Sequence, residues 1–138
     1  AAAAAARQDL DGASSRMRDG RDRLWTLLRN AIPEIERNGA PWDRSLPNTL
    51  NVSVPGIAGE SLLVLLDLGG VAASLGSACA AGSVEPSHVL RAMGADDARA
   101  RSGLRLSLGP QTSDDEVRRA AAVIVGAVQQ IRRERAAS

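Results

Sequence analysis

The sequence contains no lysine, and all 17 of its basic residues are arginine. A reaction that needs a lysine Schiff base therefore cannot be completed by this chain alone. A single cysteine, Cys79, excludes a disulfide within the chain and is typical of a reducing compartment. Trp25 and Trp42 are the only aromatic residues, and the net charge is +1. We therefore expect no nucleic-acid partner, because neither base-stacking rings nor a basic surface is available.

Long hydrophobic runs are absent as well. No apolar stretch approaches the roughly 20 residues needed to span a bilayer. The alanine run at residues 1–6 has no basic residue before it and is too short for a signal peptide. We therefore expect a soluble, cytoplasmic protein without a membrane partner. The chain begins without methionine in an alanine run that favours a helix, which suggests an excerpt from a longer sequence.

The order of apolar patterns predicts an α+β fold. Helical spacing of apolar residues predicts a helix over 3–31, where Pro33 ends the pattern. A run that is apolar almost all round predicts a helix over 60–68, and Pro86 in a first turn with Gly94 as terminator predicts one over 86–93. Alternation predicts strands at 49–54 and 104–108, a further short strand is expected at 71–73, and the glycine and prolines within 38–48 predict a loop. Ser113 to Glu116 has the form of a capping box that opens a final helix. We expect a small sheet of about three strands with helices packed on it.

Cys79 lies in a stretch of very small residues. Nine of the eleven residues 73–83 are glycine, alanine or serine, so the stretch can bury little apolar surface. We expect an exposed, mobile loop over about 74–84. A lone cysteine is more often a small buried hydrophobe than a nucleophile, and the neighbouring motifs decide between these readings.

Three stretches in register resemble the C-terminal small domain of a cysteine desulfurase, in the class V aminotransferase family. They are residues 46–53 (LPNTLNVS) with 59–63 (GESLL), 76–79 (GSAC) with 82–90 (GSVEPSHVL), and 104–109 (LRLSLG). The resemblance implies the small domain of a fold-type I enzyme that uses pyridoxal phosphate (PLP). It also implies that Cys79 attacks the sulfur of substrate L-cysteine, leaving alanine and an enzyme persulfide. Arg105 is implied to hold the substrate carboxylate, for which a planar guanidinium is suited.

The resemblance also sets limits on this chain. In the family, the Schiff-base lysine and the other PLP-binding residues belong to a larger N-terminal domain, so the chain should be inactive alone. We expect residues 1–37 to be a connecting helix and residues 38–138 to be the small domain. The family implies a homodimer in the full-length enzyme. The long interval between Cys79 and Arg105 resembles enzymes that pass sulfur to iron–sulfur scaffold proteins or to sulfur-transfer proteins for tRNA thiolation.

Alternative functions remain open from the sequence. One is a non-catalytic sulfur-relay or docking module that lost its PLP domain, and another is a selenocysteine lyase. His88 is predicted one or two turns into its helix and is interpreted as structural, while Glu85 is expected to cap or border that helix. Asn48 and Asn51 are interpreted as hydrogen-bonding residues of a turn and a strand edge.

Overall fold

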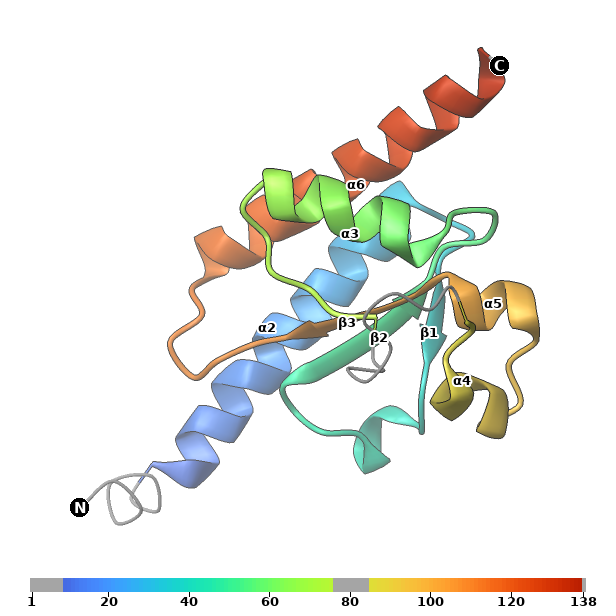
Figure 1. The fold of residues 1–138 in the computed structure, drawn as a ribbon. Coiled ribbons are helices and arrows are strands. Elements are labelled where there is room, and N and C mark those ends of the chain that lie inside the picture. Colours follow the sequence, from blue (N-terminus) through green and yellow to red (C-terminus); the bar gives the residue numbers. More distant parts are fainter. Residues whose placement is uncertain (1–8, 76–84, 138) are drawn as a thin grey trace.

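A computed structural model describes residues 9–75 and 85–137 and shows a three-stranded antiparallel sheet with helices packed on it (Figure 1). The sheet order is β1-β2-β3, with β1 (Glu36–Asn38), β2 (Thr49–Ser53) and β3 (Gly103–Ser107). The helices are α2 (Leu10–Ala31), α3 (Gly59–Leu68), α4 (His88–Ala92), α5 (Asp97–Arg101) and α6 (Asp114–Ala136), with a 3-10 turn η1 (Trp42–Arg44). The expected α+β class is confirmed.

One face of the sheet is covered by helices α2, α3 and α6. The two long helices α2 and α6 pack on each other, and α3 packs on α6 and β3. The side chains that meet there are aliphatic, and burying each of them contributes roughly 1.5–3 kcal/mol. The fully buried members include Leu28, Val52, Leu66, Leu104, Ile124 and Val128. The core therefore rests on the apolar stripes visible in the sequence.

Helix α6 begins with the predicted capping box. The Ser113 hydroxyl accepts a hydrogen bond from the Glu116 backbone N–H at 3.3 Å, and the Glu116 carboxylate accepts one from the Ser113 backbone N–H at 2.7 Å. Two backbone N–H groups that the helix cannot satisfy internally are thus satisfied by side chains. The arrangement fixes the start of the helix that closes the core.

We expect this capping box to make stability depend on acid. Hydrogen bonds from the Ser113 backbone and hydroxyl hold the pKa of Glu116 below its ordinary value. A lowered folded-state pKa stabilises the fold above the unfolded-state value, and this stabilisation is lost as pH falls through the folded-state pKa. A Glu116→Gln variant keeps the acceptor but does not titrate. Its melting temperature should lie below that of the parent at about pH 7, and the difference should shrink as the pH falls through the folded-state pKa of Glu116. A difference that stays constant would contradict the assignment.

The predicted short strand at 71–73 is wrong. Only the next residue, Ser74, forms an isolated bridge, and its partner is Arg105. The third strand is instead β1, whose three residues are Glu-Arg-Asn and show no apolar alternation. The sequence placed these residues partly in a connecting helix and partly in a loop. The proposed division of the chain at residue 37, which falls within β1, stays a prediction.

The region after residue 84 also differs from the sequence prediction. Helix α4 begins at His88, and the Ser87 hydroxyl caps it by accepting from the Leu90 N–H at 3.4 Å. Glu85 therefore does not cap this helix, and His88 is its first residue rather than one or two turns inside it. Helix α5 was missed because Ala100 is its only buried residue, so it carries no apolar stripe.

Candidate functional site

The second face of the sheet is polar. Along β2 and β3, Leu50, Val52, Leu104 and Leu106 enter the core, and the residues between them face the other way. On β3, Arg105 is exposed, as strand alternation predicts. Asn51 lies directly opposite it on β2 and is half-buried. Side chains at such paired positions share one face of the sheet.

The backbone of Arg105 is held by the segment that follows α3. Its N–H donates to the Ser74 carbonyl at 2.6 Å, and its carbonyl accepts from the Ser74 N–H at 3.0 Å. Because both groups point toward Ser74, they do not bond β2. Asn51 and Arg105 therefore form the non-hydrogen-bonded type of antiparallel pair, in which facing side chains lie closest.

The Arg105 guanidinium is available for a ligand. It makes no hydrogen bond or ion pair with any residue in the ranges 9–75 and 85–137. Arginine is charged at all physiological pH values and donates from a planar fork that matches a carboxylate. An exposed guanidinium is suited to bind an anionic group when its strand pairs with β2 on one side and its own backbone is bonded to Ser74 on the other.

Cys79, the predicted nucleophile, lies outside the described residues. The first described range ends at Leu75, directly after the Ser74–Arg105 bridge. Cys79 follows Ser74 by five residues, and five residues of extended chain span at most about 18 Å. The segment that leads to Cys79 thus starts beside Arg105. The roles of both residues stay predictions at this point.

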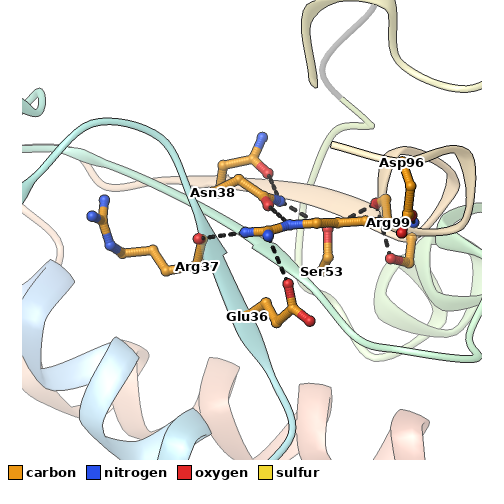
Figure 2. A network of polar contacts seen from close by, with 8 residues as sticks. Glu36, Arg37, Asn38, Ser53, Asp96 and Arg99 are labelled. Atoms are coloured by element: carbon orange, nitrogen blue, oxygen red, sulfur yellow. Dashed lines mark hydrogen bonds and ion pairs between the residues drawn. The ribbon is translucent and has the colours of Figure 1, made fainter. Parts of the chain in front are cut away.

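A polar network adjoins this site and was not found from the sequence (Figure 2). Arg99 of α5 donates from Nε to Asn38 Oδ1 at 2.7 Å and from Nη2 to the Arg37 carbonyl at 3.0 Å, and it pairs with Glu36 at 2.8 Å. The Ser53 hydroxyl donates to the Arg99 carbonyl at 2.9 Å. These contacts tie α5 to β1 and β2. They join residues far apart in sequence, so no local pattern could reveal them.

Residues 9–75 and 85–137 contain neither a membrane-spanning helix nor a cluster of metal ligands. No helix there combines the length and the hydropathy needed to cross a membrane. No group of three or more His, Cys, Asp or Glu side chains there is placed to hold a metal ion. His88 is exposed at the start of α4, and its interpretation as structural stays a prediction.

Known proteins match most of this chain. A model of the family described as aminotransferase class-V matches residues 1–120. The chain is 44% identical over 124 residues to an IscS-like cysteine desulfurase of Mycobacterium tuberculosis, covering 90% of this chain and 32% of that protein. It is 40% identical over 136 residues to a cysteine desulfurase of Gluconacetobacter diazotrophicus, covering 95% and 32%. The chain thus spans about a third of the length of these relatives.

Solved structures agree in fold. A NifS-like protein superposes with a TM-score of 0.76 at 31% identity, covering 90% of this chain and 30% of that one. A NifS-like protein from Rickettsia africae gives a TM-score of 0.72 at 20% identity, covering 88% and 31%, which shows the fold alone. The expected resemblance to cysteine desulfurases is confirmed by the sequence relatives. On the match over residues 1–120, the chain belongs to the class-V aminotransferase family.

Proposed function

We propose that this chain is the sulfur-accepting part of a cysteine desulfurase, which converts L-cysteine to L-alanine. In this proposal Arg105 binds the substrate carboxylate, and Cys79 accepts the substrate sulfur. The observation that carries it is the bridge between Ser74 and Arg105, because it joins the segment leading to Cys79 to an exposed guanidinium. The similarity to cysteine desulfurases supports the same assignment.

Arg105 supplies recognition and orientation. Two parallel N–H groups of a guanidinium can bind both oxygens of one carboxylate and so fix its plane. The strand pairing with Asn51 and the bridge to Ser74 hold the backbone from which this side chain extends. A lysine would supply the charge without the fork. The proposed role is therefore to set where the substrate sulfur lies.

Cys79 supplies the nucleophile. Its thiolate forms a bond to the substrate sulfur while the bond between that sulfur and the substrate β-carbon breaks. The carbon keeps the bonding electron pair and takes up a proton, which gives alanine. The sulfur atom stays on Cys79 as a persulfide. Carbon is reduced and sulfur oxidised in the same step, so no external oxidant is required.

The family is PLP-dependent, and PLP when bound supplies an electron sink for such a cleavage. The residues of this chain do not fit the group, because no lysine is present to form its imine. We therefore assign no residue here to the cofactor. We propose that a further part of a longer, homodimeric polypeptide holds it, in keeping with a chain that spans about a third of its relatives. This chain by itself should show no turnover.

The persulfide sulfur must be passed on. We propose an acceptor protein in the cytoplasm, either an iron–sulfur scaffold or a sulfur-transfer protein for tRNA thiolation. This acceptor would meet the Cys79 persulfide after the substrate-derived alanine has left. Transfer of labelled sulfur from the protein to each purified acceptor would distinguish the two.

Replacing Arg105 by alanine in the full-length enzyme tests the proposal. We expect KM for L-cysteine to rise between about tenfold and a hundredfold with kcat changed much less, because a charged hydrogen-bonding partner of the substrate is lost. Arg105→Lys should recover only part of the affinity. Ser107→Ala, an exposed position on the same strand face, is the matched control. An unchanged kcat/KM in Arg105→Ala would refute the role.

A further inference from the structure

The side-chain amide of Asn51 lies on the polar sheet face opposite Arg105. We propose that this amide is a second donor to the substrate carboxylate and that Asn38 and Arg99 set its orientation. The inference rests on the proposed function and adds a substrate-binding residue to it. Some atoms of the network can only donate a hydrogen bond and others can only accept one, and this determines how each amide lies.

The orientation of Asn38 is fixed by Arg99. A guanidinium has donors and no acceptor, so the atom that faces Arg99 Nε must be the Asn38 oxygen. The Asn38 amide nitrogen then faces Ser53 Oγ at 2.8 Å and Asn51 Oδ1 at 2.9 Å. Its two N–H groups serve one partner each. The ambiguity that usually attaches to an amide side chain is thereby removed.

Ser53 gives an independent check of this polarity. Its hydroxyl donates its one proton to the Arg99 carbonyl at 2.9 Å, so toward Asn38 it can only accept. An Asn38 side chain turned by 180° would place two acceptors against each other here and two donors against each other at Arg99. Asn38 and Ser53 are 7% and 1% exposed, so water cannot relieve such a mismatch.

The same logic determines how Asn51 must lie. Because Asn38 presents an N–H, Asn51 receives it with Oδ1 and directs its own amide nitrogen away from the network. That nitrogen has no hydrogen-bond partner in the described part of the chain. The hydrogen bonds therefore run from the Arg99 guanidinium of α5 through Asn38 to Asn51 of β2. The amide nitrogen of Asn51 is left as an unused donor.

The position of this donor fits a carboxylate held by Arg105. The two residues face each other in a non-hydrogen-bonded pair, so their side chains leave the sheet side by side. Arg105 is exposed and Asn51 is half-buried, so a small molecule can reach both side chains from solvent. A carboxylate has lone pairs for several donors and can accept from both residues.

The test compares Asn51→Ala and Asn51→Asp in the full-length enzyme. We expect Asn51→Ala to raise KM for L-cysteine about tenfold with kcat nearly unchanged, the size of effect for a lost hydrogen bond to a charged group. Asn51→Asp can still accept from Asn38, but it presents a negative oxygen to the substrate and should raise KM further. Thr49→Val, on the same face of β2, is the matched control and should leave KM unchanged.

The positioning role has its own variant. Asn38→Asp keeps an acceptor for Arg99 and removes the N–H groups that orient Asn51. KM should rise several-fold. The new carboxylate pairs with Arg99, but it also faces the Ser53 hydroxyl oxygen as an acceptor, so the melting temperature should fall and KM is measured well below it. An Asn38→Asp enzyme with the parental KM would show that Asn51 does not depend on this orientation and would overturn the positioning role.

The outcomes separate this inference from the proposed function. If Arg105→Ala raises KM while both Asn51 variants leave it unchanged, the carboxylate site stands and the inference about Asn51 is wrong. An equal rise in Asn51→Ala and Thr49→Val would also reject it, since the effect would come from the strand alone. If Arg105→Ala itself leaves kcat/KM unchanged, the proposed function fails first.

Discussion

Replacing Cys79 by alanine should abolish persulfide formation while the absorbance of the bound cofactor in the full-length enzyme is retained. Cys79 is the only thiol in this chain, and a methyl group can neither attack sulfur nor hold it. Loss of a covalent nucleophile removes activity by more than about 10⁴-fold in enzymes that depend on one. Cys79→Ser should be equally inactive, because a hydroxyl cannot form the sulfur–sulfur bond.

The measurement can be made specific to this position. Trypsin cleaves after arginine, and no arginine or lysine lies between Arg44 and Arg91, so Cys79 falls in the single peptide 45–91. After reaction with L-cysteine and alkylation under non-reducing conditions, the parent peptide should carry the mass of one additional sulfur atom. Variants at Cys79 should lack it. Sulfur that still accumulates on the protein in Cys79→Ala would show that another group is the acceptor.

Among alanine substitutions of the arginines in α4 and α5, Arg99→Ala should lower the free energy of unfolding most. The change leaves the Asn38 oxygen and the Arg37 carbonyl without their donor. Asn38 is buried, so leaving its oxygen unsatisfied costs about 1–3 kcal/mol, whereas the carbonyl of half-buried Arg37 and the half-exposed ion pair with Glu36 add less. We expect a loss of about 2 kcal/mol, or a melting temperature lower by about 7 °C.

Arg91 provides the control for Arg99. It forms a two-point pair with Asp97 at 2.7 and 2.9 Å, and both partners are more than half exposed. Such surface pairs contribute little, because solvent screens them and ordering two long side chains costs entropy. Arg91→Ala should therefore leave the melting temperature nearly unchanged. Equal losses in both variants would indicate that the helices, rather than the buried acceptors, control stability.

Much of the scaffold could be predicted from the sequence. The alternation in β2 and β3 and the capping box before α6 are local patterns, and the structure confirms them. Arg105 and Cys79 were found through a resemblance carried by three motifs in register. Both residues belong to short contiguous motifs that can be recognised in the sequence without a three-dimensional structure.

The remaining features depend on contacts between distant segments. Strand β1 exists because β2 pairs with it and because Asn38 is bonded to Asn51, Ser53 and Arg99. From the sequence, Asn51 is interpreted as a hydrogen-bonding residue at a strand edge. In the structure Arg99, far along the chain, determines through Asn38 which atom of Asn51 faces outward.

The sequence by itself therefore determined the apolar stripes, the helix start and the residues proposed for the chemistry, since these depend on neighbours along the chain. Only the tertiary structure decided the third strand, the bridge from Ser74 to Arg105 and the direction of the hydrogen bonds from Arg99 through Asn38 to Asn51. The physical reason is that a hydrogen bond between distant residues is specified by donor and acceptor positions in space. Local residue patterns carry no record of those positions.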